Sequence, residues 1–490
     1  MLDGTSIEDP NRADFINRLS YLEGLRFDGT GNTHSPLGKL PSFYKLIVSF
    51  PGPMAVKPDS RTHMNHLLAL APHINQLTDV AYIKDGIKYC RLLLSRGMLA
   101  FLAQTALGML LHCAFQLTHK IEYLNEAISS AQDSINTFDS FGDRAAMLTA
   151  LISSLSTRLE FLHHEEDLHE LMQLFPTVAH YTSSEELPIS FHWASIAHRF
   201  GHPSALTAYE HAMSWMQSSV RFAPTLDKQH SRLVRMRGLH MIPLHYTSYH
   251  IHTGNLEKAI ETLEQGRGLL WSEMRGLRTS IDQLCLADSD LAKKFSVVNR
   301  KLEALIMAPS LDNSFDGNNG LQGMDTYGDG VIRKQKLLDD REKLITQIRA
   351  LSGFDTFLKP PSFDNLCSAA SHSTVAIINH CEWRSDILIL FHHNSPPSLI
   401  PTSDDFYIRT NKLQDQLLAE REKGLESNAY DEALRAILKE LYELVGRPVI
   451  KRLNELNIPE QSRIWWCLTS VFCSLPLHAM GPILSVMGPP

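Results

Sequence analysis

The stretch SFHWASIAHRFGHPSALTAYEHAM, residues 190–213, decides the fold of the first half of the chain. Its first part carries one apolar stripe at helical spacing: Trp193, Ile196, Ala197 and Phe200. Its second part continues in steps of four and three: Ala205, Tyr209 and Ala212. Residues three or four apart lie on one face of a helix. Small residues let two helices approach and an aromatic ring fills the groove between them, so the stretch predicts a helical hairpin.

Copies of this spacing recur along the chain. After a turn at Gly254-Asn255, the pattern returns at Ala259, Leu263 and Gly266. A third copy has Leu107, Gly108 and Leu111, followed after a longer connection by Ala127 and Ala131, and a fourth, degenerate one starts at Asp9. Recurring hairpins are typical of α-solenoids, in which each repeat packs on its neighbours. Because tetratricopeptide (TPR) hairpins pack small and large side chains in this way, the pattern favours a TPR-like α-solenoid. A bundle of unrelated amphipathic helices is the alternative.

Residues 1–308 are predicted to form this helical repeat region. The expected helices are 12–28, 84–95, 97–118, 122–138, 143–163, 165–174, 187–200, 203–221, 228–252 and 255–277. Almost nothing before about residue 370 alternates with period two, so no strands are expected there. The stretch 33–62 is rich in proline and glycine and predicts a long loop or a damaged repeat.

The composition changes at 309–331, where Gly, Asn, Asp and Ser dominate and predict a flexible linker. Beyond it, residues 332–490 are expected to open an α/β domain. The expected helices are 332–351, 405–422 and 429–456, and the expected strands are 374–379, 386–391 and a buried one at 464–468. The predicted fold class is therefore mostly α, a TPR-like solenoid followed by an incomplete α/β domain.

Composition excludes several classes of protein. Lys and Arg number 46 against 54 Asp and Glu, for a net charge of −8, whereas a general nucleic-acid binder carries a basic surface. Apolar residues make up 43%, enough to bury a core. The seven cysteines are odd in number and widely spaced, which indicates reduced thiols. With an acidic, polar start that does not resemble a signal peptide, the sequence predicts a cytoplasmic protein.

One apolar stretch could be taken for a membrane span. Residues 97–118 carry no Asp, Glu, Lys or Arg, and a span needs about 20 apolar residues. The stretch also contains Gln104, Thr105, His112 and Gln116, and its small residues recur at helix-packing spacing. We therefore expect a helix buried in a bundle and no membrane partner.

Two segments carry a likeness to a known family. One is GNLEKAIETLEQGRGLLWSEMRGLR at 254–278, and the other combines FDTFLKPPSF at 354–363, AIINHCEWRSDILIL at 376–390 and SRIWWCLTSVFCSLPLHAMG at 462–481. Together they resemble fungal TPR proteins that end in a caspase-like CHAT domain. The resemblance implies a relative of caspases and separase with a Cys–His dyad. In that family a His-Gly follows a later strand, and the nucleophilic Cys follows the next.

The sequence departs from the family where the dyad would lie. No His in the chain is followed by Gly, and the sequence ends soon after His478. Where Cys-Pro-Thr-Gly often follows the Trp pair, this chain has Cys467-Leu468-Thr469-Ser470. The dyad therefore cannot be transferred to any residue, and we expect a truncated member of the family.

Other candidate sites fail on spacing, so no catalytic, cofactor-binding or metal-binding residue is predicted. A thiol nucleophile needs a base in reach and a lowered pKa. His380 and Cys381 are neighbours in an extended run and should face opposite ways. Cys473 and His478 are separated by Pro476, which prevents a regular element. Buried or otherwise ordinary cysteines are expected at these positions.

The metal and phosphate motifs are incomplete. A zinc helix needs two histidines four residues apart, and that pair is missing among His163, His164, Glu165 and His169. Steps of five place successive histidines of the set His240, His245, His250 and His252 on different faces of a helix. A calcium-like loop begins at Asp312 but has Gly323 in place of the Glu at its twelfth position, and Gly38-Lys39 lacks the remaining residues of a phosphate loop. Helix-surface charge is expected at Glu257, Lys258, Glu261 and Glu264. Arg267, Arg275 and Arg278 are expected to be solvated, to bind a carboxylate or to dock the α/β part.

The sequence therefore predicts a non-catalytic scaffold that binds a protein or peptide in the solenoid groove. A caspase-like cysteine peptidase is the alternative if the true chain continues past Pro490. A third possibility is an unstable product, because a sheet cut short leaves an unpaired edge. On that view residues 355–490 would be degraded by protease before the helical half.

Overall fold

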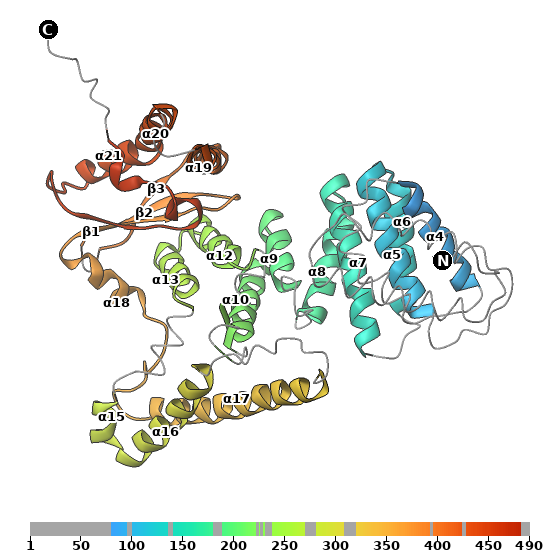
Figure 1. Cartoon of the computed structure of the whole chain (residues 1–490), viewed down its shortest axis with the longest axis horizontal. Helices are drawn as coiled ribbons and strands as arrows, with labels where there is room; N and C mark the ends of the chain where they lie inside the picture. Colours follow the sequence, from blue (N-terminus) through green and yellow to red (C-terminus); the bar gives the residue numbers. More distant parts are fainter. Residues whose placement is uncertain are drawn as a thin grey trace, which may run out of the picture. The chain divides into compact units, whose positions relative to one another are not determined.

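The computed structural model describes residues 80–95, 100–135, 141–179, 189–221, 225, 229–230, 238–269, 281–307, 320–392, 395–423 and 428–481. These residues are mostly helical and include a small four-stranded mixed sheet (Figure 1). The chain divides by its internal packing into two compact units, Met1–Thr182 and Ser183–Pro490. The degenerate repeat at Asp9, the loop at 33–62, Gly38-Lys39 and the calcium-like loop that begins at Asp312 lie outside the described residues or largely so.

The first unit is a series of helices in which each packs on the next. They are α4 (Val80–Ser95), α5 (Ala100–Thr118), α6 (Ile121–Ile135), α7 (Phe141–Leu162) and α8 (Glu165–Val178). Helix α5 contacts α4, α6 and α7, which explains why it lacks charge on every side. None of the helices that the structure describes combines the length and the apolar content that a membrane span needs.

A polar contact joins three of these helices. Arg158 on α7 donates to both carboxylate oxygens of Asp167 on α8, at 2.9 and 2.6 Å, and to Asn125 Oδ1 on α6 at 2.8 Å. The Asp167 side chain is 3% exposed. A buried carboxylate needs such a partner because removing a charge from water is costly, so Arg158 fixes the packing of α8 on α7.

The predicted hairpin is present at the start of the second unit. It consists of α9 (Ile189–Arg199) and α10 (Ala205–Arg221), with the turn at Gly201, whose φ of +65° favours glycine. Tyr209 is fully buried between the helices, and Trp193 Nε1 donates to Ser204 Oγ at 2.9 Å. A second pair follows, α12 (Met241–His252) and α13 (Leu256–Arg267), and α12 packs on both α9 and α10.

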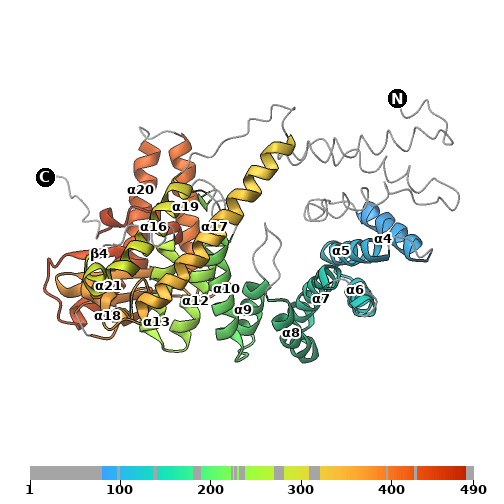
Figure 2. The same cartoon turned by 90° about the horizontal axis from the view of Figure 1, so that it is seen from below.

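The predicted linker is partly helical. Helices α15 (Asp282–Ala287) and α16 (Ser289–Ile306) are followed by α17 (Gly320–Arg349), which lies alongside α16 (Figure 2). The stretch predicted as linker, 309–331, therefore ends in helix from Gly320 onward, and residues 309–319 lie outside the described part. Extending a helix that is already packed costs less than starting one. The pair buries Arg341, whose Nε donates to Asn299 Oδ1 at 2.9 Å.

The sheet has the strand order β3-β2-β1-β4. Its strands are β1 (Thr374–Asn379), β2 (Asp386–Leu390), β3 (Ser398–Pro401) and β4 (Ile464–Cys467). β1 pairs antiparallel with β2 and parallel with β4, and β2 pairs antiparallel with β3. The strands expected near 374–379 and 386–391 are confirmed, whereas the four-residue β3 was not expected. The strand expected to be buried at 464–468 is half-buried, because β4 lies at the edge and Trp465 is 53% exposed.

Helices cover both faces of this sheet (Figure 1). Ile378, Ile387 and Ile389 pack on one face against α19 (Phe406–Lys423), α20 (Asn428–Leu441) and α21 (Arg447–Glu455). The other face packs against α12, α13 and the short α18 (Phe363–Cys367) through Ile377, Leu388 and Leu390. Helices that the sequence analysis placed in the repeat region therefore share a core with the sheet.

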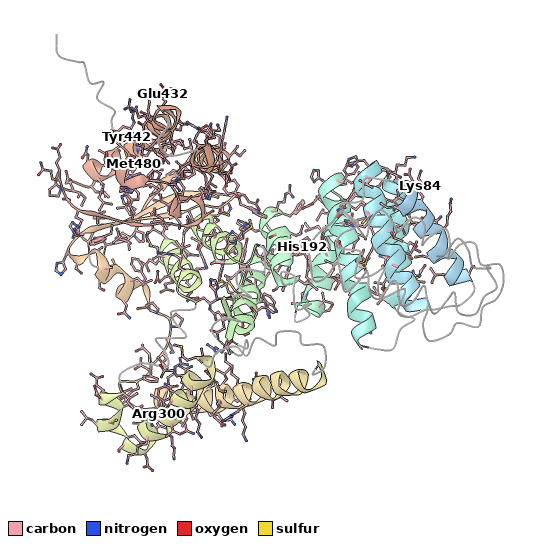
Figure 3. The ribbon with its side chains drawn as sticks, in the orientation of Figure 1. Lys84, His192, Arg300, Glu432, Tyr442 and Met480 are labelled. Carbon is pink, nitrogen blue, oxygen red and sulfur yellow. The ribbon has the colours of Figure 1, made fainter. Side chains whose placement is uncertain are left out.

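The helix expected at 429–456 is divided by a π-helical turn, Tyr442–Gly446. Gly446 lies against the Tyr442 ring, and a Cβ atom there would be 2.7 Å from Tyr442 Cδ2 and 3.5 Å from Met480 Sδ. Figure 3 shows Tyr442 and Met480 close together at this place. The segment that follows β4, which includes the short 3-10 helices Ser470–Cys473 and Leu477–Ala479, therefore passes beside this turn at Met480.

Candidate functional site

A pocket of about 590 Å³ lies in the second unit, where α9 and α12 approach the sheet. Its lining comes from residues 381–386, which join β1 to β2, and from 401–404 at the end of β3. His198 on α9, His252 on α12 and Tyr407 on α19 complete it. The volume is within the range of ~300–1,000 Å³ that is usual for ligand sites, so this pocket is the candidate functional site.

Hydrogen bonds hold the β1–β2 connection in one conformation. Ser385 Oγ accepts from Cys381 N at 3.1 Å and donates to Cys381 O at 2.9 Å. Thr402 Oγ1 donates to Ser385 O at 2.6 Å, which ties the connection to the end of β3. These contacts satisfy backbone groups that the tight turn would otherwise leave unpaired.

The same connection is anchored to the helices. Ser248 on α12 donates from Oγ to Arg384 O at 2.9 Å, and Asn379 Nδ2 donates to Ser248 Oγ at 2.9 Å. Asn379 Nδ2 also lies 3.3 Å from Leu244 O. All of these groups except part of Arg384 are buried. Residues far apart in the sequence thus position the floor of the pocket.

One wall of the pocket is aromatic. The Trp383 ring lies 4.9 Å from the ring of His198 and 5.5 Å from that of His245. His198 also contacts Tyr249 at 5.3 Å, and its Nδ1 lies 3.0 Å from the Tyr209 hydroxyl. Burial lowers the pKa of both His198 and His245 to about 4, so both rings are neutral at neutral pH.

The charges of the pocket are unequal. Arg384 holds the buried carboxylate of Asp386 through two contacts, Nε–Oδ2 at 2.7 Å and Nη2–Oδ1 at 3.1 Å. Burial raises the pKa of Asp386, and the Arg384 guanidinium opposes that rise. Glu382 is exposed, and its Oε1 lies 3.6 Å from His245 Nε2, beyond hydrogen-bond distance. Asp404 is also exposed. Two carboxylates are therefore left without a cationic partner in the described part of the pocket.

His380 and Cys381 enter different cores, as their adjacency predicts. His380 Nε2 lies 2.8 Å from Thr410 Oγ1, and its ring stacks on Tyr407 at 4.6 Å and contacts Phe472 at 5.5 Å. Cys381 belongs to the core on the other face of the sheet, which includes Leu388. Burial lowers the pKa of His380 to about 4 and raises that of the Cys381 thiol. Because a nucleophilic thiol needs a lowered pKa and a base in reach, this pair is arranged for packing.

The remaining sequence candidates do not gather into this pocket. Cys473 and His478 are exposed near the end of the described chain, and Cys473 Sγ contacts Leu468 O at 3.7 Å. His163, His164, Glu165 and His169 are exposed around the α7–α8 junction. Of the residues that the structure describes, no three His, Cys, Asp or Glu are grouped so as to hold a metal ion. His252, from the histidine-rich helix, lines the pocket.

Two charged residues of α13 contact the α/β part. Arg267 donates to Cys467 Sγ on β4, consistent with the docking role that the sequence allowed for it. Glu261, expected to be surface charge, accepts from Phe363 N at 2.8 Å and pairs with Lys258 at 2.9 Å. It thereby satisfies a backbone donor at the start of α18. Arg275 and Arg278 lie outside the described residues.

The pocket was not predicted from the sequence. Glu382, Trp383 and Arg384 lie in the short turn between two expected strands, within the stretch 376–390 that carries the family likeness. A tryptophan flanked by opposite charges in so short a turn is the signal that could have drawn attention to it. Asp404 and His198 have no such local signal, because they reach the pocket only through tertiary packing.

Comparison with known proteins adds no relative. No protein-family model matches the chain, and no curated protein shows significant similarity to it.

Proposed function

We propose that this protein is a non-catalytic interaction scaffold of the cytoplasm, in which TPR-like helical hairpins and a CHAT-like α/β domain together bind a protein or peptide. The helical hairpins supply extended surfaces of the kind that peptides and helices use. None of the described cysteines takes part in a disulfide, as suits a reducing compartment.

The packing of the second unit supports the TPR-like part of the proposal. The pairs α9–α10 and α12–α13 follow one another, and α12 packs on both helices of the preceding pair. Small residues occur where the helices approach: Ala205, Ala208 and Ala212 are all buried on α10. A solenoid is built from such pairs stacked on their neighbours.

The binding function is supported by the pocket, whose described thiol is not activated for nucleophilic attack. Its only described cysteine, Cys381, is buried and has a raised pKa, and the neighbouring His380 is directed into another core. The other residues that line the pocket form a preorganised frame with aromatic and acidic side chains. Such a frame favours recognition of a ligand over nucleophilic attack on one.

Peptide display against the immobilised full-length chain tests the proposal. We expect enrichment of a peptide motif whose binding is saturable and competed by the free peptide. The same preparation is incubated with fluorogenic peptide substrates, alongside Cys381→Ser and Cys473→Ser variants. Turnover that either substitution abolishes would restore the cysteine-peptidase alternative, and failure to enrich any motif would count against the scaffold.

A further inference from the structure

We propose that the pocket between α9, α12 and the β1–β2 connection binds an arginine side chain of an extended peptide, with Glu382 and Asp404 as counter-charges and Trp383 as the aromatic wall. The inference rests on the proposed function and names the chemistry that the binding surface selects.

The charge of the pocket lining favours binding of a cation. Arg384, the single cation of Arg or Lys type in the described lining, is engaged by Asp386 at 2.7 and 3.1 Å. Glu382 and Asp404 are left over, and the side chain of Asp404 makes no hydrogen bond or ion pair with the described part of the chain. A bound anion would be repelled by the two carboxylates. A bound apolar group would remove water from both carboxylates without supplying other hydrogen-bond partners.

The aromatic wall distinguishes a guanidinium from other cations. Trp383 is half-buried, and its ring centroid lies 4.9 Å from that of His198 and 5.5 Å from that of His245. Indole is the best aromatic partner for a cation. A guanidinium is planar and weakly hydrated, so it stacks on such a ring while its N–H groups donate to carboxylates. A lysine ammonium can satisfy the carboxylates but not the stacking.

The frame is rigid before the ligand arrives. The backbone of 381–386 is tied internally by Ser385, to β3 by Thr402 and to α12 by Ser248. A backbone that need not be reordered on binding loses less entropy. Glu382, Ser403 and Asp404 are exposed at the rim, and about 590 Å³ exceeds the needs of one side chain. The residues that flank the arginine in a peptide therefore have room at the mouth.

The test uses the full-length protein and fluorescence anisotropy with a fluorescein-labelled, end-capped peptide Gly-Ser-Ala-Arg-Ala-Ser-Gly. Matched peptides carry lysine, citrulline or glutamate in place of arginine. We expect the arginine peptide to bind best and citrulline, the neutral isostere, to bind at least about tenfold more weakly. The variant Glu382→Gln/Asp404→Asn should lose about tenfold in affinity for the arginine peptide. Trp383→Leu should bring arginine and lysine peptides to similar affinity.

The matched control is Asp431→Asn/Glu432→Gln, which removes the same charge from exposed positions of α20 (Glu432 is labelled in Figure 3). It should bind like the unsubstituted protein, and both double variants should melt at the same temperature because all four side chains are exposed. Equal binding of arginine and citrulline peptides, equal losses in the two double variants, or no binding up to about 1 mM overturns the proposal. Competition by free arginine amide as strong as that of unlabelled peptide would assign the site to a small guanidinium compound and overturn the peptide part.

The two proposals can fail separately. Peptides recovered by display whose binding is unchanged in Glu382→Gln/Asp404→Asn would leave the scaffold standing and remove the arginine pocket. A display experiment that enriches nothing, together with an unbound arginine peptide, would remove both.

Discussion

Gly266 on α13 lies so close to Pro243 on α12 that a Cβ atom added to Gly266 would be 2.3 Å from Pro243 Cβ. No real pair of side chains tolerates that distance, so one helix must move if Gly266 gains a methyl group. The position is also the last small residue of the repeat pattern found in the sequence. The close approach of α12 and α13 therefore depends on this glycine.

Gly266→Ala should destabilise the second unit by about 1–3 kcal/mol, because the added methyl forces the two helices apart. Thermal unfolding followed by circular dichroism measures the change. Gly108→Ala on α5 is the matched control, since nothing lies within 4 Å of a Cβ atom there. Alanine has the higher helix propensity, so that control should be neutral or slightly stabilising. A Gly266→Ala protein as stable as its parent would contradict the close packing.

Arg158→Met should destabilise the first unit by about 3 kcal/mol, because it leaves the carboxylate of Asp167 buried without its cation. Urea unfolding gives the difference. Arg91→Met breaks an exposed ion pair with Glu126, whose side chains are 50% and 38% exposed, and should cost at most about 1 kcal/mol. Similar losses in the two variants would mean that burial of Asp167 contributes nothing.

Acid should destabilise the second unit through its buried histidines. Burial lowers the pKa of His245, His250 and His380 from 6.5 to about 4. The unfolded chain then binds more protons than the folded one between those values, so stability is lost as the pH falls from about 6.5 to about 4. Each ring contributes at most about 3 kcal/mol. Urea unfolding at a series of pH values measures the slope.

His250→Phe isolates one of these rings. His250 is buried against Tyr246 at 4.4 Å, neither of its nitrogens has a hydrogen-bond partner, and Lys258 and Glu261 act on its pKa in opposite directions. Phenylalanine keeps the ring contact and removes the titration, so the pH slope should become shallower. His169→Phe, at an exposed position, should leave the slope unchanged. An unaltered slope in His250→Phe would refute the assignment.

The thiols should differ in reactivity according to their burial. Burial raises the pKa of Cys90 to about 12 and that of Cys113 to about 11, and it also raises the pKa of Cys381. Cys285 and Cys473 are exposed. In the native protein, a thiol reagent such as dithionitrobenzoate should modify those two first, because only the thiolate reacts. Cys285→Ser/Cys473→Ser should remove the fast phase, and a fast phase that persists would show that the half-buried Cys467 or a buried thiol is accessible.

The sequence by itself determined the elements that depend on local periodicity. Trp193 to Phe200 and Ala205 to Ala212 form the hairpin that their spacing predicts, and the β-branched run at 374–379 forms β1 with the same bounds. Periodicity shows which face of an element is apolar, because that face must be buried somewhere. It does not show what covers the face.

Only the tertiary structure decided what meets across the sheet. Ser248 and Arg384 are 136 residues apart in the sequence yet joined by a hydrogen bond, and no local pattern relates them. The short β3 forms because it pairs with β2. Glu261 accepts a hydrogen bond from the start of α18 because the sheet brings α13 and α18 together. The pocket belongs to the same class of feature: its charged and aromatic groups come from segments that are ordinary in isolation. Their arrangement arises from the burial of two apolar faces against one sheet.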